Sequence, residues 1–120
     1  MEISSRELGK LGEETAVNFL KEKGYQIKER NYTFGKGELD IIALDGEITV
    51  FIEVKSRNNL EMGDPVYGVT PAKVKQIKRI AELYLYDRDI KEINCRFDVI
   101  SVLFRGQEDP LIEHYVNAFD

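Results

Sequence analysis

The residues best suited to chemistry lie at positions 37–57, which read GELDIIALDGEITVFIEVKSR. If this stretch is a strand pair, its charged side chains at alternate positions share one face: Glu38, Asp40, Glu53 and Lys55. Asp40 and Glu53 would be diagonal neighbours, about 7–8 Å apart, with side chains long enough to converge. Two carboxylates on one hard cation suit Mg²⁺ or Mn²⁺. The ammonium of Lys55 could then orient an attacking water or stabilise charge on a phosphoryl oxygen.

The strand pair itself is predicted from its turn. Two runs rich in β-branched residues flank Asp45-Gly46, and Asp-Gly between such runs is a strong hairpin signal. With these two residues as the loop, Asp40 is expected opposite Phe51. The second face would be wholly apolar and would need a covering helix; its members are Leu39, Ile41, Ala43, Val50, Ile52 and Val54.

A solvated charged face is the alternative for these residues, because a glutamate and a lysine at alternate strand positions are common on exposed sheets. Ile42 and Phe51 on the same face favour a partly covered cleft instead. Glu38 is expected opposite Glu53, where it would either complete a metal site or raise its neighbour's pKa through like-charge proximity. We treat Glu38 as an accessory candidate, ranked below Asp40 as a ligand.

A helix over about residues 5–23 is predicted upstream of the hairpin. Ser4 and Glu7 match a capping box, and Gly24 suits the residue that follows a helix. Gly9 and Gly12 are unusual inside a helix, where each costs up to about 1 kcal/mol relative to alanine. Close approach to a sheet would explain both glycines.

Helix geometry also distinguishes two neighbouring acids. At about 100° per residue, Glu13 falls at the border of the apolar face, whereas Glu14 points to solvent. Glu13 is therefore either the acid that reaches inward or an ordinary border residue.

The ordered set of blocks resembles known nucleases. Asp40, followed after a hairpin by Glu53-Val54-Lys55, resembles the D…(D/E)xK site of restriction-endonuclease-like nucleases. Together with the GKLGE block at 9–13 and the RFD block at 96–98, nearly the whole chain resembles the uncharacterised YraN-like family. It is similar, more distantly, to archaeal Holliday-junction resolvases.

The resemblance implies a restriction-endonuclease-like α/β/α sandwich with a mixed central sheet, and a metal-dependent endonuclease acting on DNA. Asp40 and Glu53 would hold Mg²⁺ or Mn²⁺, with the carbonyl of Val54 as a further ligand. Lys55 would position or help deprotonate the water, and Glu13 would complete the acidic cluster. Structured or branched DNA, in repair or recombination, is the implied substrate, and a homodimer is implied by analogy with the resolvases.

Three cations are candidates for contact with nucleic acid. Lys36 lies in a Gly-Lys-Gly turn, and Arg57 begins a predicted loop over 56–69 that would border the cleft. Lys73 lies in a helix predicted to start at Thr70-Pro71 and to run to about residue 87. Cations near a helix N-terminus oppose the macrodipole, so either phosphate contact or simple solvation must account for them.

Three further strands are predicted, over about 25–31, 95–104 and 111–119, the last two separated by a turn at 107–110. Arg96 and Asp98 share a face and are expected to pair with each other or with a neighbouring strand. His114 is the only histidine, and we expect it to be structural. Cys95 is the only cysteine, which excludes an intramolecular disulfide and a thiolate-rich zinc site.

Composition limits the class of protein. The 120 residues suit a single domain spanning 1–120, with 42% hydrophobic and 32% charged residues. No stretch approaches the roughly 20 apolar residues of a membrane span, and no signal-peptide pattern occurs, so we expect a cytoplasmic protein with no membrane partner. The net charge of −5 argues against indiscriminate binding of nucleic acid through bulk charge, but it leaves room for a local basic surface.

Two other functions compete with the nuclease. The first is a catalytically inactive nucleic-acid-binding or scaffolding protein on the same fold, which the acidic net charge favours. The second is a metal-dependent phosphodiesterase acting on small nucleotides.

Overall fold

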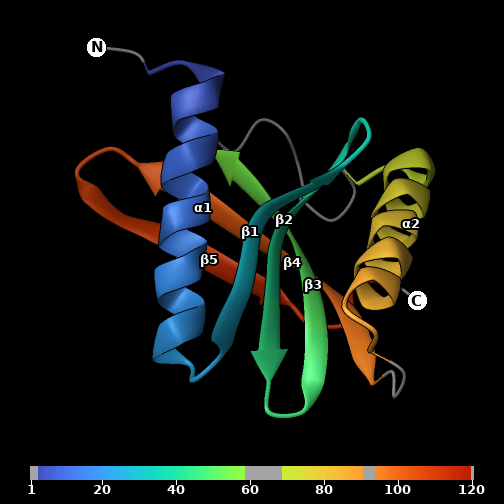
Figure 1. Cartoon of the computed structure of the whole chain (residues 1–120). Coiled ribbons are helices and arrows are strands. Elements are labelled where there is room, and N and C mark those ends of the chain that lie inside the picture. Colours follow the sequence, from blue (N-terminus) through green and yellow to red (C-terminus); the bar gives the residue numbers. More distant parts are fainter. Residues whose placement is uncertain (1–2, 59–68, 91–93, 120) are drawn as a thin grey trace.

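A five-stranded mixed sheet lies at the centre of the fold, with one helix on each face (Figure 1). The computed structural model describes residues 3–58, 69–90 and 94–119. Its elements follow the chain as α1 (Ser5–Glu22), β1 (Gln26–Phe34), β2 (Gly37–Asp45), β3 (Ile48–Arg57), α2 (Pro71–Asp87), β4 (Cys95–Arg105) and β5 (Glu108–Tyr115). The sheet order is β1-β2-β3-β4-β5; β3 and β4 are parallel and the other pairs antiparallel. The predicted α/β/α sandwich with a mixed sheet is confirmed.

Both helices begin where their capping residues predict. Ser4 Oγ accepts a hydrogen bond of 3.1 Å from the Glu7 amide, and Thr70 Oγ accepts one of 3.1 Å from the Lys73 amide. Each bond satisfies one amide that the first helical turn leaves without a partner. After α1 the chain reverses at Gly24, whose φ of 91° lies in the left-handed region that glycine adopts without strain.

The sheet separates two apolar cores. The core under α1 contains Ala16, Val17, Leu20, Tyr25, Ile41, Ala43, Val50, Ile52, Ile100 and Val102. The core under α2 contains Leu39, Ile42, Phe51, Ile77, Ile80, Ala81, Tyr84 and Leu85. The expectation that a helix covers the apolar hairpin face is confirmed, since four of its six members are buried in the α1 core and Val54 packs against it.

The predicted register between β2 and β3 is wrong by two residues. Asp45 pairs with Ile48, so Gly46-Glu47 is the loop, and Ile42 rather than Asp40 lies opposite Phe51. Gly46 has a φ of 62° and supplies the left-handed residue that a two-residue hairpin loop needs. A register shift of two residues does not by itself move any side chain to the other face of the sheet, so this error displaces the pairing along the hairpin only.

A break in strand alternation near Asp40 was also missed. Leu39 and Ile42 are both buried in the α2 core, whereas Ile41 is buried in the α1 core. Strict alternation would place Leu39 with Ile41, as the sequence predicted. Asn31 of β1 lies between Arg30 and Tyr32, which pair with Ile41 and Leu39, and it has a φ of 52°, so both strands depart from regular geometry at the same level.

Strand ends differ modestly from prediction. β1 continues to Phe34, and β5 begins at Glu108, so the two turns are shorter than expected. β3 extends through Arg57, which removes the first residues from the predicted loop at 56–69, and positions 59–68 of that loop lie outside the described residues. No helix in the described ranges is long and apolar enough to cross a membrane.

One of the two helical glycines lies where α1 meets the sheet. A Cβ at Gly12 would collide with the Oγ and Cβ of Ser56 on β3. Among the described residues, a Cβ at Gly9 would meet nothing within 4 Å. The predicted close approach is therefore confirmed for Gly12 and wrong for Gly9.

Asp98 is the centre of a buried polar network under the C-terminal end of α1. It accepts hydrogen bonds from Arg96 Nε at 3.0 Å and from the Asn117 amide at 2.9 Å, and His114 Nε2 lies 2.7 Å from Asp98 Oδ2. Arg96 also contacts Asp45 at 3.0 Å. The expected pairing of Arg96 with Asp98 is confirmed, and these contacts fit the structural role predicted for His114.

Candidate metal centre

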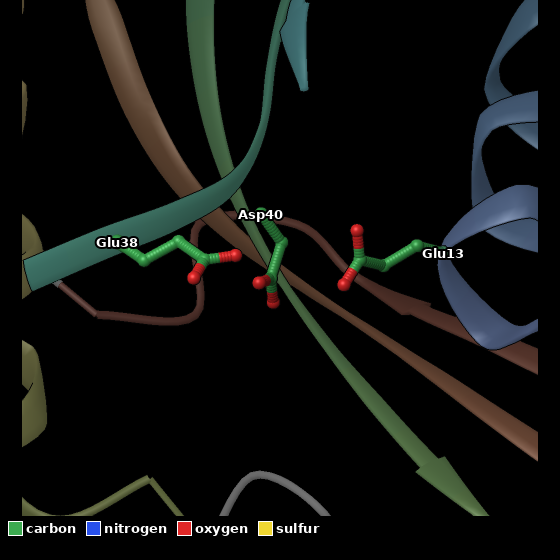
Figure 2. A group of neighbouring side chains, drawn as sticks. All are labelled: Glu13, Glu38 and Asp40. Carbon is green, nitrogen blue, oxygen red and sulfur yellow. The ribbon is translucent and has the colours of Figure 1, made fainter. Parts of the chain in front are cut away.

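Three carboxylates from α1 and β2 converge beside the sheet (Figure 2). Oxygens of Glu13, Glu38 and Asp40 all lie within 4.8 Å of one another. Figure 2 shows Asp40 between the other two, with Glu13 reaching from α1 toward β2. We call these residues the acidic cluster. Glu38 therefore groups with Glu13 and Asp40, and the prediction that it lies opposite Glu53 is wrong.

Two local features bring Glu13 to the cluster. Gly12, the preceding residue, lets α1 approach Ser56 at the end of β3. The break in alternation at Asp40 directs both β2 carboxylates to the side on which α1 packs, where strict alternation would have placed them under α2. Glu13 is thus the inward acid of its pair, whereas Glu14 forms an exposed ion pair of 3.0 Å with Arg30.

The electrostatics of Glu13 show that the cluster is crowded with negative charge. Burial raises the pKa of Glu13, and the neighbouring charges of Asp40 and Glu38 raise it further. A side-chain hydrogen bond from Asn31 acts in the opposite direction and lowers the Glu13 pKa. A divalent cation would relieve the mutual repulsion of these acids directly.

Asp40 is fixed by the backbone of the neighbouring strand. Regular pairing between β2 and β3 ends at Ile41 and Ile52. Just beyond it, the Val54 amide donates a hydrogen bond of 2.8 Å to Asp40 Oδ2. One carboxylate oxygen is thereby oriented while the other stays available as a ligand. Val54, predicted to offer its carbonyl to a metal, contributes its amide to the site in this way.

Glu53 adjoins the cluster from β3 and carries its most perturbed carboxyl group. Only 6% of the residue is exposed, and its Oε2 has no hydrogen-bond partner within the described chain. Burial, followed by the charge of Asp40 and a hydrogen bond with it, raises the pKa of Glu53 to about 8. A buried oxygen without a partner is costly, and it is the kind of atom that a bound cation satisfies.

Two lysines face Glu53. The Nζ of Lys73 lies 3.9 Å from Glu53 Oε2, too far for a hydrogen bond, and donates one of 3.3 Å to Gln76. The charges of Lys73 and Lys55 both lower the Glu53 pKa against the larger effect of burial. Lys73, predicted to contact phosphate, therefore lies beside a candidate metal ligand.

The other two cations predicted to contact nucleic acid lie outside the group of carboxylates. Lys36 is exposed in the turn between β1 and β2, and Arg57 is half-buried at the last position of β3. The structure brings together Glu13, Asp40, Glu53 and Lys55 with the accessory Glu38. It places Lys36 on a separate turn, next to α2.

Two residues of the site were not predicted. Asn31 donates to Glu13 from a left-handed backbone position, and Gln76 accepts from Lys73. Asparagine tolerates positive φ better than most residues. The position of Asn31 at the end of a predicted strand could therefore have indicated an irregular backbone there. No pattern singled out Gln76, since glutamine on a helix surface is ordinary.

The donor set fits Mg²⁺ or Mn²⁺. It consists of carboxylate oxygens on rigid elements, one oriented by the Val54 amide and one buried without a partner. Such cations take oxygen ligands and bind through a few carboxylates while retaining water. Asp40 is central to any such arrangement, because it is hydrogen-bonded to Glu53 and also lies beside Glu13 and Glu38.

Comparison with known proteins identifies relatives along nearly the whole chain. Residues 12–102 match the model of the uncharacterised protein family UPF0102, the YraN family that the sequence resembles. A UPF0102 protein of Dictyoglomus turgidum is 42% identical over 118 residues, covering 98% of this chain and all of the relative. One from Chlorobium limicola is 44% identical, covering 99% of this chain and 96% of the relative. One from Geotalea daltonii is 44% identical, covering 97% of this chain and 91% of the relative.

Proposed function

The chain belongs to the uncharacterised protein family UPF0102, and we propose that it is a divalent-metal-dependent nuclease that hydrolyses DNA phosphodiester bonds, with structured or branched DNA as substrate. One observation carries the proposal: a buried Glu53 oxygen that has no hydrogen-bond partner in the described chain lies beside the acidic cluster, with a lysine two residues along the same strand. Buried carboxylates that repel one another lower the stability of the folded protein unless a bound cation neutralises their charge.

Asp40, Glu53 and Glu13 would hold the cation, with Glu38 and the Val54 carbonyl as accessory donors. When bound, Mg²⁺ or Mn²⁺ supplies Lewis acidity, which makes water more acidic and offsets negative charge on the phosphate. Glu53 holds a proton at neutral pH in the absence of a cation, because burial and then the charge of Asp40 raise its pKa to about 8. Cation and proton therefore compete for the same oxygens.

Lys55 acts on the reacting atoms in this proposal. Its ammonium lies on the same face of β3 as Glu53 and close enough to lower that residue's pKa. A lysine there holds the attacking water in line or donates to a phosphoryl oxygen as charge builds on it. Asp40 stays oriented throughout by the Val54 amide.

A second candidate function has its own supporting observation. Lys73 places a cation of the chain itself 3.9 Å from Glu53 Oε2. An internal counter-charge would suit a nucleic-acid-binding or scaffolding protein that keeps the cluster without using a metal. The two candidates make opposite predictions for metal dependence.

The test is cleavage of labelled single-stranded, duplex, flapped and four-way DNA in Mg²⁺, in Mn²⁺ and in EDTA. The proposal expects cutting that needs the metal and is lost in Asp40→Asn. Glu14→Gln is the matched control, because it removes one negative charge from an exposed position of α1 next to Glu13, outside the cluster. DNA binding without cutting under any metal would support the binding protein instead. No cutting and no binding would reject both.

A further inference from the structure

A pocket of about 210 Å³ lies between the β1–β2 turn and the middle of α2, apart from the acidic cluster. The turn contributes residues 34–37, and α2 contributes Gln76, Arg79, Ile80 and Leu83. Turn and helix pack directly at Gly37, where a Cβ would collide with the Ile80 side chain. The pocket is therefore built from two fixed elements.

The lining combines an aromatic ring, aliphatic side chains and cations. Phe34, the last residue of β1, is 51% exposed and offers an aromatic ring to the pocket. Ile80 and Leu83 supply apolar surface, while Lys36 and Arg79 supply positive charge. No acidic side chain in the described ranges forms an ion pair with either cation. Their charge is thus available to an anionic ligand that also presents a flat apolar face.

The pocket adjoins the candidate metal centre. Gln76, one of its lining residues, accepts a hydrogen bond of 3.3 Å from Lys73, whose ammonium lies 3.9 Å from Glu53. Gly37 packs against α2, whereas the next residue, Glu38, belongs to the acidic cluster on the α1 side. A ligand seated in the pocket would therefore extend toward Glu53.

We propose that this pocket binds one unpaired nucleobase of a DNA strand, stacked on Phe34, while Lys36 and Arg79 hold the flanking phosphates. The volume of about 210 Å³ exceeds the roughly 150 Å³ of a cavity that accommodates benzene, so a planar base fits. Every base offers a π-face to an aromatic side chain, and the amide of Gln76 is positioned to reach a base edge.

The inference specifies the substrate of the proposed nuclease and rests on that proposed function. A base inside a duplex is not free to enter a side pocket without unstacking, which costs a few kcal/mol. The pocket therefore selects DNA that already has an unpaired nucleotide beside the scissile phosphate. It narrows the substrate class from structured DNA in general to junctions of paired and unpaired strand.

The experiment uses the absence of tryptophan from the sequence. Phe34→Trp places the only tryptophan of the variant in the pocket, and Tyr86→Trp, at a residue of α2 that is 87% exposed and outside the pocket lining, is the matched control. Both variants are titrated in Ca²⁺ with single-stranded DNA, a blunt duplex, a duplex with a single-stranded branch, and deoxyadenosine monophosphate. Ca²⁺ takes oxygen ligands and offsets the acidic charge.

Stacking predicts that single-stranded and branched DNA quench the emission of the Phe34→Trp variant, whereas the blunt duplex and the mononucleotide do not. Emission of the Tyr86→Trp control stays unchanged. Phe34→Ala should weaken binding of branched DNA about 10-fold and binding of the blunt duplex less than about 2-fold. Equal quenching by the blunt duplex, or unchanged binding by Phe34→Ala, would overturn the assignment. If the mononucleotide quenched the emission as strongly as single-stranded DNA does, the ligand of the pocket would be a free nucleotide, and the assignment to a DNA strand would be overturned.

Cleavage measured in parallel separates the two proposals. Metal-dependent cutting with Phe34→Ala unimpaired would reject the pocket assignment and leave the nuclease in place. Quenching by branched DNA without cutting under any metal would support the pocket and reject the nuclease. Absence of both binding and cutting would reject the two together.

Discussion

The carboxyl group of Glu53 combines properties that rarely coexist. It is buried, it has an oxygen without a hydrogen-bond partner in the described chain, and its pKa is raised to about 8. Lys73 at 3.9 Å offsets only part of this cost. The most economical explanation is a cation that the carboxylate is shaped to receive, since strongly perturbed acids cluster at functional sites.

The pH dependence of stability follows from this group. A folded-state pKa raised above the unfolded value of 4.5 means that the folded protein binds the proton more tightly. The free energy of unfolding should therefore fall as pH rises from about 5 to 8, by roughly 2–4 kcal/mol in EDTA. Glu53→Gln should lack this fall, and urea unfolding across that range measures it. Glu14→Gln should behave as the wild type; a parallel slope in the Glu53→Gln variant would show that another group is responsible.

Lys55 gives the sharpest prediction about turnover. Lys55→Ala should reduce cleavage at least about 100-fold, the magnitude of losing one charge-stabilising group in a transition state. Binding of Mn²⁺, followed by calorimetry, should change little, because an ammonium is not a ligand. Lys75→Ala, on the exposed surface of α2, is the control. Unimpaired cleavage by Lys55→Ala would remove that residue from the mechanism.

At the scale of single elements, α1 depends on one glycine for its position. Gly12→Ala should destabilise the protein by about 1–3 kcal/mol, because its methyl group meets Ser56. Gly9→Ala, three residues earlier in the same helix, should instead stabilise by up to about 1 kcal/mol, since space is free there. Thermal unfolding of the two variants compares them directly. Similar effects in both would mean that α1 is free to shift away from β3.

Gly12→Ala should also impair the site. A helix pushed away from β3 carries Glu13 away from Asp40 and Glu38, so Mn²⁺ affinity should fall more than in Gly9→Ala. Restored affinity in the Gly12→Ala, Ser56→Gly double variant would show that the contact between α1 and β3 positions the acid.

The elements themselves were largely predictable, because capping residues, alternation and turn glycines are local signals. Ser4, Thr70 and Gly24 end or begin helices as their chemistry predicts. The hairpin register was missed because Asp-Gly suggests a loop of those two residues, whereas the structure pairs Asp45 and makes Gly46 the first loop position. A choice between such loops depends on packing along the whole strand.

The residues of the site could be predicted from the sequence, but which of them lie next to one another could not. Alternation placed Glu38 and Asp40 on the face away from the N-terminal helix, which left Glu13 without a path to them. The irregularity at Leu39 and Asn31 removes that conflict. No local propensity specifies such a break; it is set by the two cores, which compete for Leu39, Ile41 and Ile42.

At the scale of the molecule, the Asp98 network ties the C-terminal strands to the rest. Lys23 donates to His114 Nδ1 at 3.0 Å, so His114 Nε2 carries the proton that it donates to Asp98. Arg96 extends the network to Tyr25 at 2.6 Å. These contacts link the segment that follows α1 to β4 and β5, and they lie on the α1 side of the sheet with its apolar core.

Asp98→Asn should destabilise the protein by about 3–5 kcal/mol at pH 7, because it leaves the guanidinium of Arg96 half-buried without its main counter-charge. Burial opposes the charged form of Asp98, but hydrogen bonds from His114 and Arg96 lower its pKa below 3.8. The stabilisation is therefore complete above pH 3.8 and is lost as pH falls through the lowered pKa. Urea unfolding should show the variant approaching the wild type only in strong acid. A pH-independent difference would point to lost packing instead.

The strands lie in the sheet in the order in which they occur in the chain, and this has a consequence for how the molecule folds. Strands joined by a short turn, β1 to β2, β2 to β3 and β4 to β5, need little loop closure, so these hairpins can form early, whereas the parallel pair of β3 and β4 must wait for the crossover through α2. The acids and Lys55 all lie between positions 13 and 55, ahead of α2. During synthesis, the crowded carboxylates thus emerge before Lys73, and their repulsion opposes docking of α1 until that lysine, or a cation from solution, arrives.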